Sequence, residues 1–339
     1  MNNESAYARA GVDIAAGQKA TELMKTAVQA TFGPEVLSNV GNFGGLFDIS
    51  SSMEQNPVLV ASTDGVGTKT MVATAMNHWN TIGHDIVNHC VNDILVQGAR
   101  PLFFLDYVAS SKLDPEQIAA VVRGIAAACS KVGCALLGGE TAEMPGVYQT
   151  GELDLVGTVV GIVERNRIID GSHIKAGDVI LGLPSSGLHT NGYTLARSVL
   201  GALNWHEPYP DLGDTPGNVL LAAHRCYLPE VQALWEADID IRGMAHITGG
   251  GLVDNPPRIF PKGLGAVIKR GSWPVPPIFN LIQTLGNISD AEMAHVFNMG
   301  LGMLVIMPPE QAERAQQILD ASFIVGKMVE GETAVTFKG

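Results

Sequence analysis

The sequence is short of charge, and most of the charge it has is negative. Only 16% of the 339 residues are charged, and the formal net charge at pH 7 is -13. A chain with this balance has no basic stripe that could neutralise a nucleic-acid backbone, which argues against a nucleic-acid-binding function. An anionic small ligand would have to be held by bound cations, backbone N–H groups and a few placed lysines.

The sequence also lacks the features of membrane and secreted proteins. No apolar run approaches the roughly 18 residues of a membrane-spanning helix. Residues 1–5 contain neither the basic nor the apolar segment of a signal peptide. The four cysteines, at positions 90, 129, 134 and 226, form no C-x-x-C pair, so we expect buried thiols in a reducing compartment. These absences predict a cytoplasmic protein without a membrane partner.

The composition and the pattern of elements favour a two-domain α+β fold. The chain is 46% apolar with 39 glycines, and its length argues for two domains. Strands outnumber what a simple alternation of strands and helices would give, which favours α+β. Polar residues and turn signals cluster at 165–178 and predict the boundary there. Helices are predicted at 15–30, 81–97, 115–129, 219–236 and 310–319, and strands at 57–62, 102–108, 135–137, 155–163, 179–183, 266–268, 303–307 and 324–329.

The most informative segment is Thr63-Asp64-Gly65-Val66-Gly67-Thr68-Lys69, which follows the apolar run 57–62. Its glycines let the backbone approach a phosphate, its lysine can meet phosphate oxygens, and its acid can meet their magnesium. The spacing fits neither a Walker A loop nor G-x-G-x-x-G. The segment therefore indicates phosphate chemistry outside the two commonest nucleotide folds, although Lys69 alone could equally be a solvated surface lysine.

Acidic residues recur beside glycine-rich segments. We expect Asp64, Asp93, Glu140 and Glu143 near a metal, because magnesium takes oxygen ligands and usually joins carboxylates to nucleotide phosphates. Each acid by itself is more often a turn or cap residue. Their grouping at strand ends, where binding residues concentrate, favours the metal interpretation.

The second half of the chain contains two segments that favour ligand binding. His189 and Asn191 lie in a Ser-Gly-x-His-x-Asn-Gly run, where a histidine either contacts an anion, carries a proton or simply forms a turn. His246 precedes Thr248-Gly249-Gly250-Gly251, and three consecutive glycines favour a ligand-facing loop. Five other histidines, at 78, 84, 173, 206 and 224, show no metal-binding spacing and are predicted to be structural or on the surface.

Taken together, these motifs resemble one enzyme family. V-N-D-I-L-V-Q-G-A at 91–99, P-L-F-F-L-D-Y at 101–107, G-G-E-T-A-E-M-P-G at 138–146 and T-G-G-G at 248–251 resemble the aminoimidazole ribonucleotide synthetase family, as do A-G-V-D-I at 10–14 and the segment at 63–69. The resemblance extends from about residue 7 to about residue 330. The combination is specific, whereas D-G-V-G alone would be weak.

The resemblance implies a fold, a reaction and an assembly. Residues 1–168 would form an ATP-binding domain with a mixed sheet and helices, which dimerises into a barrel-like core. Residues 169–339 would form an α/β sandwich-like domain that completes the active site. The family is a ligase of purine biosynthesis. It uses ATP and Mg²⁺ to close formylglycinamidine ribonucleotide into 5-aminoimidazole ribonucleotide, and it forms a homodimer.

The resemblance also assigns roles to individual residues. ATP would be bound by Lys25, Asp64, Gly65, Gly67, Thr68, Lys69, Asp93, Gly138, Gly139 and Glu140, with magnesium at Asp64, Asp93 and Glu140. The substrate would contact Ser186, His189, Asn191, Thr248, Gly249 and Gly250. Lys69, His189 and His246 would be catalytic. The segment 29–33 departs from the family because it lacks the basic residues that other members carry there.

Two other functions are compatible with parts of this pattern. A small-molecule kinase or a selenophosphate synthetase of the same superfamily would share the D-G-V-G-T type of loop but should lack the run at 138–146. A nucleotide-binding scaffold without catalysis is disfavoured because Asp64, Lys69 and Asp93 are present. Hydrolases have no support, since G-x-S-x-G and H-E-x-x-H are both absent.

Overall fold

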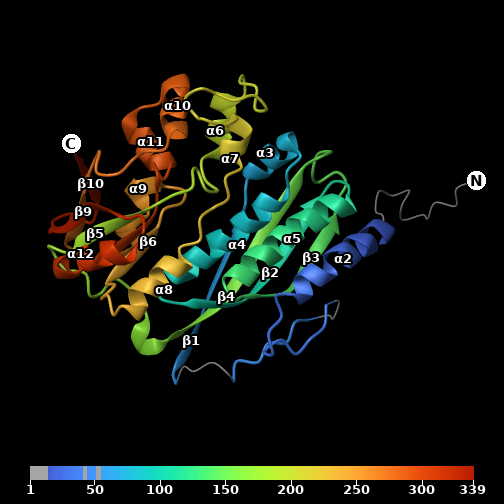
Figure 1. Ribbon diagram of the computed structural model, residues 1–339, viewed down its shortest axis with the longest axis horizontal. Helices are drawn as coiled ribbons and strands as arrows, with labels where there is room; N and C mark the ends of the chain where they lie inside the picture. Colours follow the sequence, from blue (N-terminus) through green and yellow to red (C-terminus); the bar gives the residue numbers. More distant parts are fainter. Residues whose placement is uncertain (1–13, 41–43, 51–54) are drawn as a thin grey trace, which may run out of the picture. The chain divides into compact units, whose positions relative to one another are not determined.

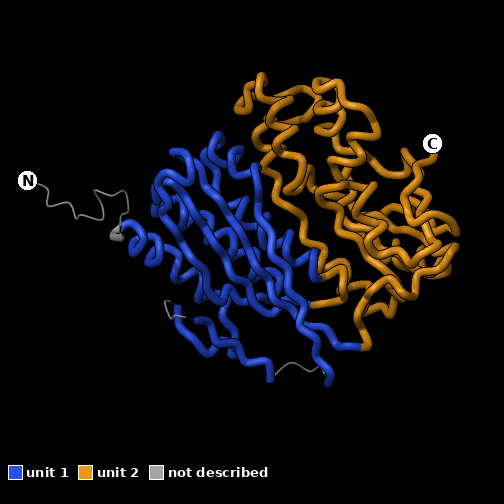
Figure 2. Tube along the Cα trace, turned by 180° about the vertical axis from the view of Figure 1, so that it is seen from behind, with its two compact units in different colours: residues 1–94, 100–165 blue, residues 95–99, 166–339 orange. Residues whose placement is uncertain are grey.

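The fold is described from a computed structural model, for residues 14–40, 44–50 and 55–339. The chain divides into two compact units, coloured separately in Figure 2. Unit 1 comprises residues 1–94 and 100–165, and unit 2 comprises 95–99 and 166–339. The predictions for residues 1–5 and for most of the motif at 10–14 concern positions outside the described residues.

Unit 1 is built on a four-stranded mixed sheet with the order β1-β4-β2-β3. Strand β4 is antiparallel to both β1 and β2, whereas β2 and β3 run parallel. The strands are β1 (Pro57–Gly65), β2 (Arg100–Ser110), β3 (Ala135–Glu143) and β4 (Leu153–Glu164), and the helices are α2 (Ile14–Gln29), α3 (Lys69–Met76), α4 (Asn80–Leu95) and α5 (Pro115–Lys131).

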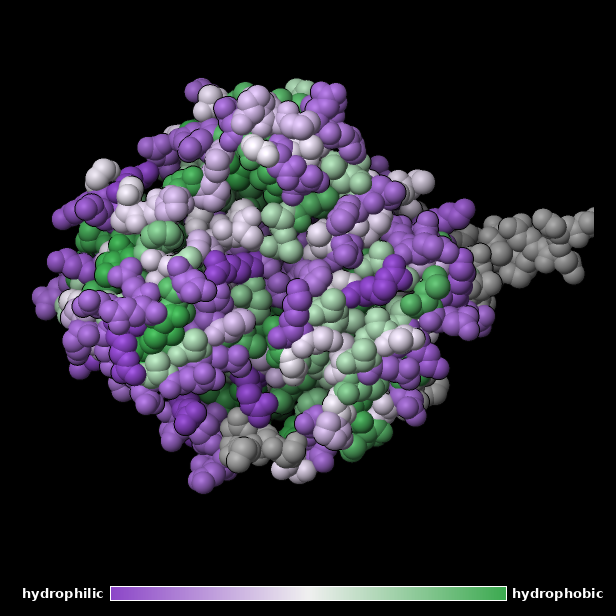
Figure 3. Space-filling view, viewed as in Figure 1, coloured by the Kyte–Doolittle hydropathy of each residue, from purple (hydrophilic) through white to green (hydrophobic). Residues whose placement is uncertain are grey.

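Helices cover one face of this sheet, and in Figure 1 α4 and α5 lie in front of the strands. The two helices approach closely because each has a glycine where they cross. A Cβ on Gly83 would lie 2.3 Å from the carbonyl oxygen of Val121, and one on Gly124 would lie 2.0 Å from that of Asn80. On the side drawn in Figure 3, hydrophobic residues are interspersed with hydrophilic ones. The buried core of unit 1 lies between the sheet and these helices, where Ile86 of α4, Phe104 of β2 and Ile125 of α5 are fully buried.

The opposite face of the sheet keeps apolar side chains exposed. We call this the open sheet face and define it by Leu59, Ala61, Phe103, Leu105 and Val160, which the strand register puts on one side. Leu59 is 59% exposed and Leu105 is 36% exposed. The alternation of exposed and half-buried residues along β1 is typical of a sheet with one covered and one open side.

Unit 2 contains a six-stranded mixed sheet with the order β10-β7-β9-β5-β8-β6. Its strands are β5 (Val179–Pro184), β6 (Gly243–His246), β7 (Leu264–Lys269), β8 (Leu301–Met307), β9 (Phe323–Glu330) and β10 (Val335–Lys338). Its helices are α6 (Tyr193–Leu200), α7 (Pro216–Leu220), α8 (Leu228–Glu236), α9 (Gly251–Asp254), α10 (Pro277–Gly286), α11 (Asp290–Val296) and α12 (Pro309–Ile318), with short 3₁₀ turns η1 (Arg165–Arg167) and η2 (Pro256–Ile259). Strand β8 is buried along its whole length and forms the centre of the core.

The predicted α+β class is confirmed, with two corrections at the level of elements. The helix predicted at 219–236 is wrong: α7 ends at Leu220 and α8 begins at Leu228, where Pro229 stands in the first turn and favours a new helix start. The glycine-rich run after residue 137 is not a loop, because β3 continues to Glu143. Within the described part of one chain the unit 1 sheet is open, so a barrel-like core stays a prediction that needs a second chain.

Among the described helices, none has both the length and the apolar character needed to cross a membrane.

Candidate active site

The segment between β1 and α3 makes a tight turn that depends on glycine. Strand β1 ends at Gly65, and Gly67 follows with a φ of 66°, a left-handed conformation that favours glycine. Thr68 then precedes α3, which begins at Lys69. The carboxylate of Asp64 accepts the N–H of Gly65 at 2.6 Å, which fixes the acid at the start of the turn.

Lys69 points into the protein and is fully buried. Its ammonium lies 2.8 Å from one carboxylate oxygen of Asp85 and 2.9 Å from the other. Burial lowers the pKa of Lys69, and the Asp85 carboxylate opposes that shift. The structure thus pairs this lysine with an acid on α4. Its contact with a phosphate stays a prediction, and it would require the ammonium to be shared between Asp85 and the ligand.

Asp64 and Asp93 meet at a single histidine. The Nε2 atom of His89 lies 2.9 Å from Asp64 Oδ2 and 3.6 Å from Asp93 Oδ2, and the hydroxyl of Ser62 donates to Asp93 at 3.0 Å. Burial acts against the charged form of His89, but the hydrogen bond that its ring donates to Asp64 and the charges of Asp93, Asp64 and Asp85 outweigh burial and raise the pKa of His89. We call these three residues the Asp64–His89–Asp93 cluster.

Within one chain, this cluster supplies only two of the three predicted cation ligands, Asp64 and Asp93. Asp64 is 43% exposed and Asp93 is 26% exposed, so both carboxylates are accessible to an ion. Glu140 is not brought to them, because its strand β3 and Asp64's strand β1 stand at opposite ends of the sheet order. Three strand spacings amount to roughly 14 Å. Glu140 also points to the opposite face of the sheet from Asp64. Gly139 is the residue in register with Asp106, Gly157 and Asp64, and side chains of successive residues in a strand point to opposite faces.

Gly138, Gly139 and Glu140 line a cavity at the β3 edge, together with residues of α2. Gly139 has no room for a side chain, because a Cβ there would lie 2.2 Å from a carboxylate oxygen of Asp106. Lys25 is exposed on α2, close along the helix to Met24, which lines the cavity. The nucleotide contacts predicted for these residues stay predictions.

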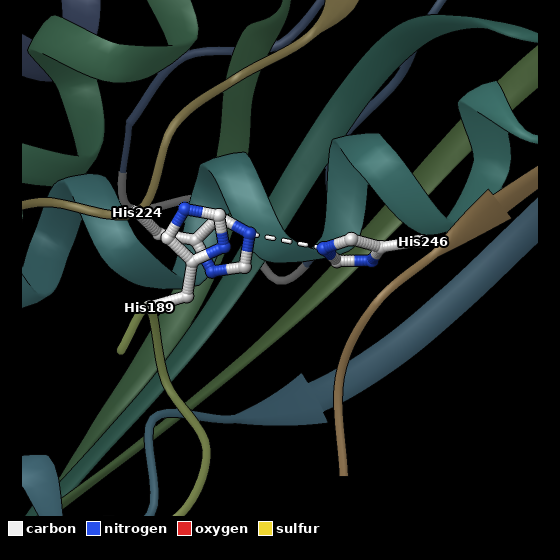
Figure 4. A group of neighbouring side chains, drawn as sticks. All are labelled: His189, His224 and His246. Carbon is white, nitrogen blue, oxygen red and sulfur yellow. Dashed lines mark hydrogen bonds between the residues drawn. The ribbon is translucent and has the colours of Figure 1, made fainter. Parts of the chain in front are cut away.

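Three histidines of unit 2 pack together in the interior (Figure 4). His224 donates to or accepts from His246 across 3.0 Å between their Nε2 atoms. The rings of His189 and His224 are stacked, with centroids 4.0 Å apart, and Thr190 Oγ1 lies 3.3 Å from His224 Nδ1. His189 itself has a φ of 62°, which for a non-glycine residue is a strained backbone conformation of the kind found at functional sites.

The three ring nitrogens are close enough to suggest a metal site, but their chemistry argues against three-fold ligation. Ser186 donates its N–H to His189 Nε2 at 3.2 Å, so that nitrogen's lone pair is used and a neutral ring carries its proton on Nδ1. Metal ligands must offer lone pairs in the ring plane, whereas His189 is stacked almost parallel to His224, with 22° between the rings. The arrangement is better suited to sharing protons between His224 and His246.

The glycine run after β6 folds back beside Asn191. Gly250 and Gly251 have φ values of 99° and 57°, and a Cβ on Gly251 would lie 2.2 Å from the carbonyl oxygen of Ala294. The Asn191 Nδ2 atom lies 3.5 Å from the Cβ position of Gly249. Ser186, His189, Asn191, His246 and the 248–250 segment, predicted as substrate or catalytic residues, therefore gather in one part of unit 2.

Sequence reasoning missed three residues that complete these groups. His89 stands four residues before Asp93, and this i, i+4 spacing on a helix is a signal that could have found it. Asp85 gives no comparable signal, because its pairing with Lys69 depends on how α3 meets α4. His224 was predicted to be structural or exposed, and the mistaken helix at 219–236 concealed it; the structure buries it between two predicted site residues.

Comparison with known proteins identifies the family. Residues 45–163 match the family described as AIR synthase related protein, N-terminal domain, and residues 175–338 match AIR synthase related protein, C-terminal domain. The chain belongs to the AIR synthase related family. The resemblance noted in the motifs is confirmed. The first match lies in unit 1 except for residues 95–99, and the second lies within unit 2.

Curated members of this family match over nearly the whole chain. A protein of Desulfitobacterium hafniense named phosphoribosylformylglycinamidine cyclo-ligase is 53% identical over 326 residues, which cover 95% of this chain and 96% of that protein. One of the same name from Geobacillus thermodenitrificans is 52% identical over 341 residues and 98% of each chain. A third, from Gloeobacter violaceus, is 51% identical over 92% of this chain and 93% of its own.

Solved structures show the same fold at low sequence identity. Hydrogenase maturation protein HypE, crystallised in complex with ATP, has a TM-score of 0.68 and 19% identity, covering 96% of this chain and 91% of its own. Thiamine-monophosphate kinase from Stenotrophomonas maltophilia has a TM-score of 0.67 and 17% identity, covering 94% of this chain and 96% of its own. At this identity the likeness concerns the fold alone.

Proposed function

We propose that this protein is an ATP-dependent ligase of purine biosynthesis that closes formylglycinamidine ribonucleotide into 5-aminoimidazole ribonucleotide, releasing ADP and phosphate. The observation that carries the proposal is the identity of about half of all residues, over nearly the full chain, with relatives named phosphoribosylformylglycinamidine cyclo-ligase. The small-molecule kinase alternative is supported only by likeness of fold to thiamine-monophosphate kinases at 15–17% identity.

The chemistry begins with a poor leaving group. The oxygen of the substrate's formyl amide leaves only after ATP has phosphorylated it. The ribose-bearing nitrogen then attacks the activated carbon, the ring closes and phosphate departs. Phosphoryl transfer needs mainly positioning and neutralisation of charge. Holding nitrogen and carbon at attack distance can supply up to about 7–11 kcal/mol of the barrier.

Residues of unit 1 fit the phosphate end of this reaction. Asp64 and Asp93 would hold Mg²⁺, which neutralises phosphate charge when bound. This assignment is supported by two accessible carboxylates that lie beside His89 and by the Ser62 hydroxyl, which is within hydrogen-bond distance of Asp93. The glycine turn at 65–67 would let backbone N–H groups approach the phosphates. Lys69 would contribute charge from its pair with Asp85.

Residues of unit 2 fit the ring-closing end. Ring closure releases a proton from the attacking nitrogen, and His246 with His224 offers a hydrogen-bonded imidazole pair that can take it. His189, held by the Ser186 N–H, would orient the substrate together with Asn191 and the 248–250 segment.

We also propose that the protein works as a homodimer through the open sheet face. Two strands of the described sheet, β1 and β3, have an unpaired edge, and the face between them exposes Leu59 and Leu105. A second copy would cover these side chains. The second copy would also bring its own Glu140, whereas the Glu140 of the same chain lies three strands away from Asp64. Four free thiols and a nucleotide substrate fit a cytoplasmic location.

The proposal is tested by incubating the pure protein with ATP, Mg²⁺ and formylglycinamidine ribonucleotide. Aminoimidazole ribonucleotide and ADP should form in equal amounts. The same assay with thiamine monophosphate in place of the ribonucleotide serves as the control for the kinase alternative. ADP formed with thiamine monophosphate, and no imidazole product from protein shown to be folded by circular dichroism, would reject the ligase function.

A further inference from the structure

The glycine run after β6 is held from its buried side by the amide of Asn255. The Oδ1 atom of Asn255 accepts the N–H of Thr248 at 2.7 Å, and its Nδ2 atom donates to the carbonyl oxygen of Gly249 at 3.0 Å. A backbone N–H can only donate and a carbonyl oxygen can only accept, so these two partners fix which way round the amide lies. One side chain thus fastens two consecutive residues of the segment predicted to contact the substrate.

Asn255 itself stands in a rigid place. It follows α9 directly and is only 3% exposed. Its own N–H donates to the carbonyl oxygen of Gly251 at 3.3 Å, and its carbonyl oxygen accepts the N–H of Arg258 at 3.2 Å. Asparagine is mostly an exposed residue, and burying an amide costs free energy unless it is hydrogen-bonded. The two backbone partners of the amide therefore account for a polar side chain where an apolar one would fill the space at lower cost.

The segment that Asn255 holds is open on its other side. Gly249 is exposed, and Thr248 and Gly250 are half-buried. Consecutive glycines have more backbone freedom than any other residues, and a ligand that bound a loose segment would have to order it at a cost in affinity. Two hydrogen bonds from a buried amide remove that freedom before the ligand arrives.

Gly249 also lies next to Asn191, another residue predicted to contact the substrate. The Nδ2 atom of Asn191 is 3.5 Å from the position that a Cβ on Gly249 would take, so the asparagine packs directly against the glycine backbone. The Oδ1 atom of Asn191 is buried, and no residue in the described part of the chain donates a hydrogen bond to it. A buried acceptor of this kind needs a donor, which a bound substrate can supply. The place of Gly249 therefore affects how Asn191 meets a ligand.

We propose that Asn255 is a positioning residue for ring closure, and that it holds the 248–249 segment against Asn191 so that the substrate meets an ordered loop. The proposal rests on the function given above and adds to it a residue that acts through the loop without touching the substrate. The segment, Asn191 and Asn255 all belong to unit 2, whereas the residues proposed to bind the ATP phosphates belong to unit 1. Loss of the Asn255 amide should therefore weaken binding of the ribonucleotide and leave that of Mg-ATP unchanged.

The main test is Asn255→Asp, which keeps the size of the side chain. An ionised carboxylate still accepts the Thr248 N–H, but it has no donor for the carbonyl oxygen of Gly249 and repels it. Steady-state kinetics of the full-length protein should give a KM for formylglycinamidine ribonucleotide about tenfold above wild type, the effect expected when one hydrogen bond is lost. The KM for Mg-ATP should stay within about twofold of wild type. A variant that merely folded less completely would lower kcat and change neither KM.

Asn204→Asp is the matched control, because it makes the same chemical change at an exposed position of unit 2. The Oδ1 atom of Asn204 accepts the N–H of His206 at 3.0 Å, and aspartate keeps this bond, so both KM values should equal those of wild type. Asn255→Ser is measured in parallel. Its side chain is too short to reach both backbone groups and adds no buried charge, and it should show the same selective rise in KM.

A double variant tests the route through Asn191. Asn191→Ala alone should raise the KM for the ribonucleotide. Adding Asn255→Asp should then raise it by less than about threefold more, because the side chain that the loop positions is already gone. Effects that multiply in full would show that Asn255 acts elsewhere and would overturn the proposal.

An unchanged ribonucleotide KM in either folded Asn255 variant also overturns the proposal. So does failure of both variants to fold, which would make the amide a purely structural element. If wild type makes the imidazole product while these results contradict the role of Asn255, only this inference fails. If folded wild type makes no product, the proposed function fails and this inference fails with it.

Discussion

At the scale of single residues, Asp93 has the surroundings expected of a magnesium ligand. One of its oxygens accepts the Ser62 hydroxyl at 3.0 Å and lies 3.6 Å from His89. The carboxylate is still partly exposed, so an ion can reach it. Its role can therefore be separated from the stability of the fold.

We predict that Asp93→Asn raises the magnesium concentration needed for half-maximal activity by at least about tenfold, which corresponds to about 1.4 kcal/mol. Asparagine keeps the size and the hydrogen bond from Ser62 but loses the negative charge. The thermal midpoint should change little. Initial rates over a magnesium series measure the effect, with Glu22→Gln, which removes one exposed carboxylate from α2, as control. An unchanged magnesium dependence would remove Asp93 from the site.

Burial raises the pKa of Asp106, with a consequence for the stability of the fold. Unfolded aspartate has a pKa near 3.9, and the folded value is about 7. Because the folded value is the higher one, the contribution of the neutral acid is complete below about pH 4 and is lost as the pH rises to about 7. Ionisation in the folded state then costs at most about 4 kcal/mol.

We therefore predict that Asp106→Asn becomes more stable relative to wild type as the pH rises from 4.5 to 7, and that the difference is constant above pH 7.5. Urea unfolding at several pH values measures it. The matched variant Glu22→Gln should show a small and nearly constant difference. A difference for Asp106→Asn that is equally flat would mean that the carboxyl ionises normally.

Residues with a local sequence signal were predictable, and those defined by tertiary proximity were not. Asp64 and Asp93 stand in recognisable runs, and the structure brings them together at His89. Asp85 and His224 carry no local signal, because their partners lie 16 and 22 residues away along the chain. Asp106 lies inside an apolar strand, where only its burial against Gly139 makes it unusual.

At the scale of elements, glycine turns follow two of the strands that lead into the candidate site, β1 and β6. Gly67 has a φ of 66° and open space where a Cβ would be. Gly251 has a φ of 57°, but its Cβ would meet the backbone oxygen of Ala294 at 2.2 Å. The two positions share the conformational strain and differ in the steric clash, so each serves as the control for the other.

We predict that Gly67→Ala destabilises the protein by about 1 kcal/mol, the cost of a left-handed alanine. Gly251→Ala should cost about 2–4 kcal/mol, because the clash with a backbone atom adds to the strain. Chemical denaturation of the two variants measures both values. Equal losses would show that α9 and α11 move apart easily, and that the loop after β6 is less constrained than its geometry indicates.

Elements with strong local signals were predicted well. The start of α5 is an example: the helix was predicted to begin at residue 115, and it does, with the Asp114 carboxylate accepting the N–H groups of Glu116 and Gln117. The segment 219–236 failed because its apolar spacing continues through residues 221–227, which are not helical. Side-chain contacts, including that of Tyr193 with the carbonyl oxygen of Leu220, decide the path of the chain there, and spacing alone does not reveal them.

At the scale of the whole molecule, the open sheet face is the feature that a single chain leaves unexplained. The prediction of a two-domain α+β protein was correct, because strand and helix patterns are local properties. Assembly is not encoded in the same way: exposed Leu59 and Leu105 become visible as one surface only after the strand register is known. The barrel-like dimer expected from the family resemblance therefore stays a prediction.

We predict that Leu59→Glu shifts the protein from dimer to monomer, because it places two buried charges in the proposed interface. Leu285→Glu is the control: Leu285 is 48% exposed on α10 of unit 2 and should leave the assembly unchanged. Sedimentation velocity measures the mass, and circular dichroism checks that both variants are folded. A Leu59→Glu dimer as tight as that of wild type would place the interface elsewhere.

The two free edges of the unit 1 sheet also bear on how the protein is made. If the protein forms the proposed dimer, a newly synthesised chain exposes β1, β3 and the apolar surface between them until it meets a second copy. That encounter is bimolecular and slows on dilution, while unpaired strand edges also capture wrong chains when the protein is concentrated. The yield of active enzyme after refolding should therefore pass through a maximum at an intermediate protein concentration, and the cell must keep nascent chains within the same window.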